Sequence, residues 1–154
     1  MAIGNEVLVM DLVSVDIEDV RGRVREAVAD LRDVVAAYLF GSAMGELRPD
    51  SDIDIALFLA AGIAVDSREA DLIAGNVALR LPPLKSHVFD VNVVDPSDSV
   101  FAYRVIAEGM ALAVNNEDRM AELLERISRA YADDGYRYRL AVQEILKEAR
   151  PNDA

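Results

Sequence analysis

Two aspartates lie within an apolar stretch of the chain, where acidic residues are unexpected. Asp52 and Asp54 fall in the run over residues 51–59, SDIDIALFL, whose other members are mostly aliphatic or aromatic. An ionised carboxylate inside an apolar strand is unfavourable unless a cation or hydrogen-bond donors compensate its charge. A divalent metal ion is the compensation that we expect here.

A third carboxylate has similar surroundings further along the chain. Asp90 lies between Phe89 and Val91 in another apolar segment. Carboxylates on neighbouring strands can ligate Mg²⁺, which prefers oxygen ligands and often shares them with substrate phosphates. We therefore predict a site for one or two Mg²⁺ ions, held by Asp52, Asp54 and Asp90. Asp90 would also help to deprotonate an attacking hydroxyl.

A Gly-Ser pair precedes the acidic stretch. Gly41 and Ser42 end an apolar run, and a polar loop that extends to Ser51 follows them. Glycine lets the backbone approach a phosphate closely, while the serine offers a hydroxyl and an amide. The predicted nucleotide-binding residues are Gly41, Ser42 and Ser51.

The pattern around these residues predicts an α/β (α+β) fold, with a mixed central sheet flanked by helices. β-branched and aromatic runs predict strands at residues 34–40, 53–59, 87–94 and 110–114. Apolar residues at helical spacing predict helices at residues 17–32, 68–81 and 98–108. A long helical region at about 116–150 should be interrupted near Gly135, and residues 43–47 should form a turn or short helix. Alternation along a strand places Asp52 and Asp54 on one face.

Length and composition limit the class of protein. The chain has 154 residues, of which 53% are hydrophobic, and this is enough for one domain with a real core. We predict a single domain over residues 1–154, with its core at about 17–114 and a C-terminal helical region at about 116–150. The chain has no cysteines, which excludes disulfides and thiolate-held metal centres.

Charge and hydropathy limit the partners. The net charge of −12 disfavours broad nucleic-acid binding, because that binding requires Lys and Arg to neutralise phosphates. The longest apolar run, residues 55–65, is too short for a membrane helix, which needs about 20 residues. The N-terminus has no basic segment before its apolar residues, unlike a signal peptide. We expect a cytoplasmic protein that binds neither membranes nor nucleic acid directly.

The motifs resemble the signature of minimal nucleotidyltransferases in the DNA polymerase β superfamily. The resemblance covers about residues 17–139. Its motifs are the Gly41-Ser42 pair, Gly45, the segment RPDSDID at 48–54, and Phe89-Asp90-Val91. The resemblance implies a nucleotidyltransferase fold and Mg²⁺-dependent use of a nucleoside triphosphate. By position, Gly41 and Ser42 would bind the triphosphate, while Asp52 and Asp54 would hold metal.

Two further segments resemble the subgroup of these enzymes that is paired with HEPN-domain toxins. They are residues 101–109 and the sequence RAYAD at residues 129–133. The subgroup resemblance implies transfer of AMP from ATP onto a tyrosine of the toxin. The chain would then be an antitoxin, with a HEPN ribonuclease toxin as its partner.

Two alternative functions stay open. Nine residues separate Ser42 from Asp52, one fewer than in the common family form, and Ala43 replaces the usual arginine. This departure favours a non-catalytic antitoxin that neutralises the toxin by contact. An enzyme that modifies a small cationic acceptor, such as an aminoglycoside, would also suit an acidic cleft. No segment looks like a dedicated domain for such a substrate.

Several other residues have simpler structural explanations. His87, the only histidine, is expected to be a surface residue or a hydrogen-bonded strand residue rather than a metal ligand. Tyr103 and Arg104 are expected to pack along a helix. A tyrosine group at positions 131, 136 and 138 could recognise a partner or form an amphipathic docking face.

Overall fold

Residues 13–14, 16–41, 46–47 and 51–149 are the parts of the chain that the computed structural model describes. Of the predicted site residues, Ser42 lies outside the described residues. No described helix is both long enough and apolar enough to cross a membrane.

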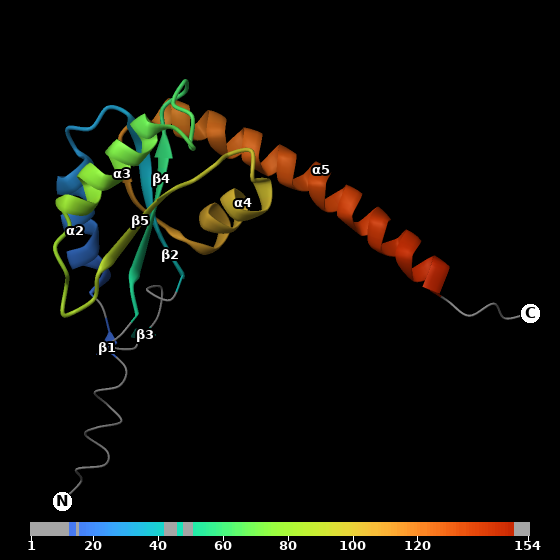
Figure 1. Ribbon diagram of the computed structural model, residues 1–154, viewed down its shortest axis with the longest axis horizontal. Coiled ribbons are helices and arrows are strands. Elements are labelled where there is room, and N and C mark those ends of the chain that lie inside the picture. The colour runs from blue at the N-terminus through green and yellow to red at the C-terminus, as the bar shows by residue number, and fades with distance from the viewer. Residues whose placement is uncertain (1–12, 15, 42–45, 48–50, 150–154) are drawn as a thin grey trace, which may run out of the picture.

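A four-stranded mixed sheet forms the centre of the molecule (Figure 1). Its strands are β2 (Val34–Phe40), β4 (Ile53–Leu59), β5 (Phe89–Val93) and β6 (Met110–Val114). Their order across the sheet is β5-β4-β2-β6, so β6 is an edge strand. β4 and β5 are parallel, whereas β2 is antiparallel to both of its neighbours. The predicted mixed sheet is confirmed.

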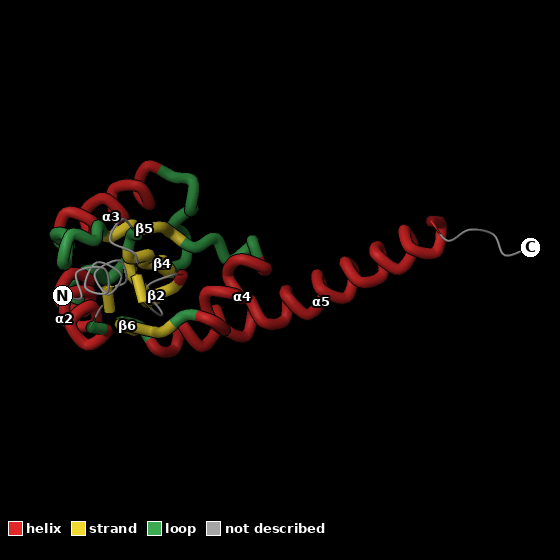
Figure 2. The backbone as a smooth tube through the Cα atoms, turned by 90° about the horizontal axis from the view of Figure 1, so that it is seen from below, coloured by secondary structure: helices red, strands yellow, loops and turns green. Residues whose placement is uncertain are grey.

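Helices cover both faces of the sheet (Figure 2). They are α2 (Ile17–Val28), α3 (Arg68–Leu79), α4 (Ser99–Glu108) and α5 (Glu117–Ala149). Ile55 and Leu57 belong to the core cluster that contains residues of α2 and α3. Ala56 and Phe58 belong to a second cluster, with residues of α4 and α5. The predicted alternation along β4 is therefore confirmed, and α2 and α3 pack on the opposite face from α4 and α5.

The end of α2 differs from its predicted position. The apolar pattern predicts a helix to residue 32, but α2 ends at Val28. The side-chain amide of Asn115 donates to the carbonyl oxygens of Val28 and Val34, at 2.8 and 3.0 Å. The backbone amide of Leu31 also donates to the Val28 oxygen, at 3.0 Å, so Asn115 adds a second donor at the helix end and joins α2 to the start of β2. This partner is remote in sequence, so the local pattern could not reveal it.

A short strand pair lies apart from the central sheet. β3 (Glu46–Leu47) pairs antiparallel with β1 (Val13–Ser14), with Val13 opposite Leu47. For residues 46–47, the prediction of a turn or short helix is therefore wrong. Backbone pairing with the N-terminal region decides their conformation, and residues 43–45 lie outside the described residues.

α5 is continuous over 33 residues, so the predicted interruption near Gly135 is wrong. One glycine in a helix costs about 1 kcal/mol relative to alanine, which the strong helix formers around it can offset. At a rise of about 1.5 Å per residue the helix is about 50 Å long, and its outer half extends away from the sheet (Figure 1). That half carries the exposed residues Tyr136, Tyr138, Leu140, Ile145 and Leu146.

Two contacts attach the middle of α5 to α4. The hydroxyl of the buried residue Ser99 donates a short hydrogen bond to Asp134 Oδ2. The rings of Tyr103 and Tyr131 stack with their centroids 4.0 Å apart and their planes at 2°. The predicted packing role of Tyr103 is thus confirmed.

Candidate active site

Parallel pairing of β4 with β5 brings two of the predicted carboxylates together. Asp54 and Asp90 are direct register partners, each the second residue of its strand. Asp54 is half-buried, whereas Asp90 and Asp52 are exposed. The two apolar segments that the sequence singled out are therefore neighbours, and their acidic residues meet at one end of the sheet.

Gly41 lies directly against this acidic pair. Phe40, the last residue of β2, is the register partner of Asp54, and Gly41 follows it with φ of 75°. A Cβ atom at position 41 would lie 2.6 Å from Asp54 Oδ2, closer than real Cβ contacts. The position requires glycine both for its left-handed backbone and for the space that the carboxylate fills.

The electrostatics of the site favour a bound cation. Burial raises the pKa of the Asp54 carboxyl, and the negative charges of Asp90 and Asp52 raise it further. The three predicted ligands are thus close enough for their charges to repel one another. A divalent cation between them would replace this repulsion by attraction.

The donor chemistry of the site fits Mg²⁺, although the ligands are not assembled. Within the residues that the structure describes, no three His, Asp or Glu side chains are gathered closely enough to hold a metal ion. Asp52, Asp54 and Asp90 offer only oxygen donors, which Mg²⁺ prefers. Because Asp52 and Asp90 are exposed, rotation about their side-chain bonds can bring them toward Asp54. Their role as metal ligands stays a prediction.

A small cavity opens beside Gly41. Its volume is about 290 Å³, and it is lined by Phe40, Gly41, Phe101, Arg104, Val105 and Glu108. The rings of Phe40 and Phe101 meet edge to face, with centroids 5.7 Å apart. An aromatic wall beside the charged side chains of Arg104 and Glu108, which pair at 3.6 Å, suits a flat, polar ring. The sequence reading did not assign Phe101 to the site, although residue 101 begins a segment that resembles the toxin-paired subgroup.

His87 also lies in the site region, and of the two expectations for it the hydrogen-bonded residue is confirmed and the surface residue is wrong. The side chain is fully buried, and its Nδ1 atom lies 2.8 Å from the backbone oxygen of Ser51. Because a carbonyl oxygen only accepts, Nδ1 donates this hydrogen bond. Nε2 is buried and has no hydrogen-bond partner among the described residues. His87 therefore positions Ser51, the residue that precedes Asp52, and is not a surface residue.

A family comparison identifies the class of protein. Residues 23–118 match the family described as polymerase beta, nucleotidyltransferase. The chain belongs to the polymerase beta nucleotidyltransferase family. The matched region of this nucleotidyltransferase contains all of the predicted site residues, and the expected enzyme class is confirmed. The comparison with curated proteins finds no match.

Chains from several toxin–antitoxin complexes have the same fold as this nucleotidyltransferase. One belongs to the complex of tri-AMPylated Shewanella oneidensis HEPN toxin with MNT antitoxin. It is 19% identical, the match covers 84% of this chain and 98% of that chain, and the TM-score is 0.55. A chain of an MntA–HpeT toxin–antitoxin mutant is 17% identical, with coverage of 82% and 98% and a TM-score of 0.59.

A third structure is a toxin–antitoxin with AMP-PNP. Its matching chain is 19% identical, with coverage of 82% and 98% and a TM-score of 0.54. At these identities the likeness establishes the fold. It confirms that the chain resembles structures of antitoxins solved with HEPN toxins.

Proposed function

We propose that this nucleotidyltransferase transfers AMP from ATP to a hydroxyl group of a protein partner. The proposed acceptor is a tyrosine of a HEPN-domain ribonuclease toxin, which would make the protein an antitoxin. The observation that carries the proposal is the parallel register of β4 and β5, which places Asp54 beside Asp90 and next to Gly41.

Each site residue has a role in the proposed reaction. Asp52, Asp54 and Asp90 would hold Mg²⁺, which when bound would neutralise charge on the triphosphate. Gly41 permits close approach of the backbone to a phosphate, and Ser42 and Ser51 flank the same loop. The acceptor oxygen bonds to the α-phosphorus of ATP while the bond from that phosphorus to the bridging oxygen breaks. Pyrophosphate leaves, and Asp90 accepts the proton of the hydroxyl.

Two observations support a protein as the acceptor. The outer half of α5 exposes several large apolar residues, among them Tyr138 with 70% of its surface accessible. A helical segment whose apolar residues are left uncovered by the described part of the chain can bury them against a partner protein. One similar structure contains an AMPylated HEPN toxin, and another contains a toxin–antitoxin mutant with two aspartates, two positions apart, changed to glutamate. The latter spacing equals that of Asp52 and Asp54.

A second candidate function is inhibition by binding alone. It is favoured by the segment between Ser42 and Asp52, which is one residue shorter than in the common family form and has Ala43 in place of the usual arginine. In that case, the protein would neutralise the toxin by contact, and the carboxylates would contribute only charge. Both functions require a HEPN-type partner, but they predict different chemical products.

Intact mass spectrometry of the partner distinguishes these functions. The protein is incubated with a co-purified HEPN toxin, ATP and Mg²⁺, and the toxin is examined for the added mass of AMP. We expect addition by the wild-type protein and a loss of at least about 100-fold in Asp54→Asn, because the ligand set is broken. Asp71→Asn, an exposed change on α3, is the matched control and should keep full activity.

The remaining outcomes are equally informative. AMP addition that persists in the double variant Asp52→Asn plus Asp54→Asn would exclude the proposed site. A tight complex without any addition would establish inhibition by binding. Addition that requires ATP but is unaffected by EDTA would contradict the role of Mg²⁺.

A further inference from the structure

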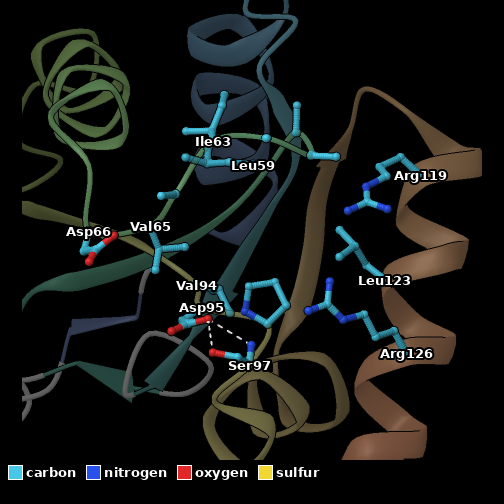
Figure 3. Close-up of a pocket in the computed structure, with 15 residues that line it drawn as sticks. Leu59, Ile63, Val65, Asp66, Val94, Asp95, Ser97, Arg119, Leu123 and Arg126 are labelled. Atoms are coloured by element: carbon cyan, nitrogen blue, oxygen red, sulfur yellow. Dashed lines mark hydrogen bonds between the residues drawn. The ribbon is translucent and has the colours of Figure 1, made fainter.

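A second and larger cavity lies at the opposite end of β4 and β5 from the candidate active site (Figure 3). Its volume is about 550 Å³. Its walls come from the loop at residues 59–66, the segment at 94–97 and one side of α5. Asp54 is the second residue of β4 and Leu59 the last, so at about 3.3 Å per residue the two ends lie about 16 Å apart. The cavity is a separate site.

Two arginines of α5 border this cavity. Arg119 and Arg126 are seven residues apart, which is about two helical turns, so both side chains lie on the same side of the helix. Figure 3 shows their guanidinium groups on the α5 side of the cavity, with Leu123 between the two arginines. Two positive charges therefore face one cavity, which is open to solvent.

Neither arginine is fully neutralised by its surroundings. The side chain of Arg119 is 26% exposed and pairs through Nη1 with the exposed residue Glu122, at 3.0 Å. Its Nε atom is buried and has no hydrogen-bond partner among the described residues. Arg126 makes no ion pair in the described part of the chain. Both guanidinium groups thus have donors left for a ligand.

A carboxylate that lines the cavity already accepts hydrogen bonds from its neighbours. Asp95 Oδ1 accepts hydrogen bonds from the amide and hydroxyl of Ser97, at 2.9 and 2.7 Å. These bonds lower the pKa of Asp95, and the charge of Arg126 contributes to the lowering. Asp66 lies across the cavity from both arginines (Figure 3). The cavity is therefore positive along α5 and acidic on its far side.

Apolar side chains form part of the remaining wall. They include Leu59, Ile63, Val65, Val94 and Leu123. A cavity of this volume that combines apolar contacts with convergent charged groups is large enough for a small-molecule ligand. It also lies where β4 and β5 end, and the carboxyl ends of parallel strands are a common place for ligands.

We propose that this cavity binds a small organic phosphate. Arg119 and Arg126 hold the phosphate group, and the apolar wall contacts the carbon skeleton. A phosphate dianion matches two guanidinium groups in charge, and guanidinium pairs with phosphate through two parallel hydrogen bonds. The inference concerns a site outside the proposed active site, and it holds whether or not the protein transfers AMP.

Amide chemical shifts of the ¹⁵N-labelled protein test the proposal, with phenyl phosphate as probe in Mg²⁺-free buffer. We expect saturable shifts in the amides of residues 61–66 and of Ser97, and tighter binding than for inorganic phosphate. Arg119→Gln plus Arg126→Gln should weaken binding at least about tenfold. Arg129→Gln removes an exposed charge of α5 that pairs with Glu125 outside the cavity, and it should bind as wild type does.

Several results would contradict the proposal of a phosphate site in this cavity. These are a lack of binding at millimolar phenyl phosphate, shifts confined to the region of Gly41 and Asp54, and equal binding by the Arg126→Gln variant. Because Arg126 is exposed, the single variant Arg126→Gln should fold. It can therefore test the site even if the double variant fails to fold. Equal affinity for benzyl alcohol would show that the phosphate group plays no part.

Discussion

Gly41 has no side chain, and an oxygen of Asp54 occupies the space where one would lie. Gly41→Ala should lower AMP transfer at least about 100-fold, because the new methyl group displaces the carboxylate from its position. The matched control is Gly62→Ala. Gly62 also has a positive φ, of 90°, but open space surrounds the place of its Cβ.

Rates of transfer and melting temperatures should be measured for both glycine variants. Both changes strain a left-handed backbone, by about 1 to 2 kcal/mol, so both should lower stability. Only Gly41→Ala should lose activity beyond what unfolding explains. Equal activity of the two variants would contradict the contact with Asp54.

Asp54 illustrates a conflict between stability and function. Its half-buried charge is repelled by Asp90 and Asp52, so Asp54→Asn should stabilise the metal-free protein while it abolishes transfer. The gain should stay below about 1 kcal/mol, because solvent screens a site this exposed.

Thermal unfolding with and without Mg²⁺ measures this effect. In EDTA the Asp54→Asn variant should melt above the wild type, and Mg²⁺ should raise the melting temperature of the wild type but not that of Asp54→Asn. Asp71→Asn should behave like the wild type in both buffers. An Asp54→Asn variant that melts below the wild type in EDTA would show that repulsion is not the dominant interaction of this carboxylate.

At the residue scale, the sequence singled out the acidic residues but not the neighbouring residues that pack around the site. Asp54 and Asp90 were recognisable because each interrupts an apolar segment. The roles of His87 and Phe101 depend on contacts with Ser51 and Phe40, which are distant in sequence. No local pattern encodes such contacts. The assignment of Gly41, Ser42 and Ser51 to the nucleotide site stays a prediction.

At the scale of helices and strands, close contacts between backbones determine how the elements pack. At Gly109, which ends α4, a Cβ atom would lie 2.4 Å from the backbone oxygen of Val105 and 2.7 Å from that of Leu39. Gly109→Ala should therefore destabilise the protein by about 1 to 3 kcal/mol, because α4 must move away from β2. Urea unfolding measures the change.

The control for this variant is Gly135→Ala in α5. Nothing lies within 4 Å of the place of its Cβ, and alanine is the better helix former. This change should stabilise the helix by up to about 1 kcal/mol. The prediction for Gly109 would be wrong if both variants changed stability in the same direction.

An ion pair that involves the end of α3 gives a pH-dependent contribution to stability. Arg80 pairs with Asp30 at 2.5 Å and also donates to the backbone oxygen of Ala27, at 3.0 Å. The hydrogen bond from Arg80 lowers the pKa of Asp30. The ion pair therefore contributes to the free energy of unfolding at pH values above the ordinary pKa of aspartate, about 4. This contribution is lost as the pH falls through the lowered pKa of Asp30 in the folded state.

Unfolding of Arg80→Gln as a function of pH tests the predicted direction of this pH dependence. The variant should be less stable than the wild type at pH 7, and the difference should shrink below about pH 4. Arg137→Gln removes an exposed charge of α5 that makes no ion pair in the described part of the chain, and it controls for net charge. A difference that grows on acidification would contradict the pairing.

The sequence predicted most elements because their apolar periodicity is regular. β2 and β4 have the predicted bounds, and α4 begins one residue later than predicted. The errors fall where a remote segment decides the outcome. Asn115 ends α2 early, and β1 makes a strand of residues 46–47.

At the scale of the whole molecule, the class of fold was predictable, but the strand order was not. Each of the four central strands precedes or follows a helix along the chain, and this element order is compatible with more than one strand order. The order β5-β4-β2-β6 fixes the meeting of Asp54 with Asp90 and the position of the second cavity. That residues 1–154 form one domain stays a prediction.

The length of α5 has a consequence for the dynamics of the molecule. Met120, Leu123 and Ile127 are buried in the core, and the contacts of Tyr131 and Asp134 attach the next turns. Residues 136–149 have no comparable anchors in the described part of the chain, and a free helix of that length is marginal in water. One continuous helix should therefore behave as two units that open independently.

Amide hydrogen exchange should reveal the boundary. Amides around residues 120–131 should exchange only with global unfolding, and those after residue 136 should exchange at least about 100-fold faster through fraying. A uniform rate along α5 would contradict this division. If the toxin binds the outer half of α5, binding should slow amide exchange there and leave exchange in the inner half unchanged. The exchange rates of the outer half would then measure how much of the protein is bound to toxin.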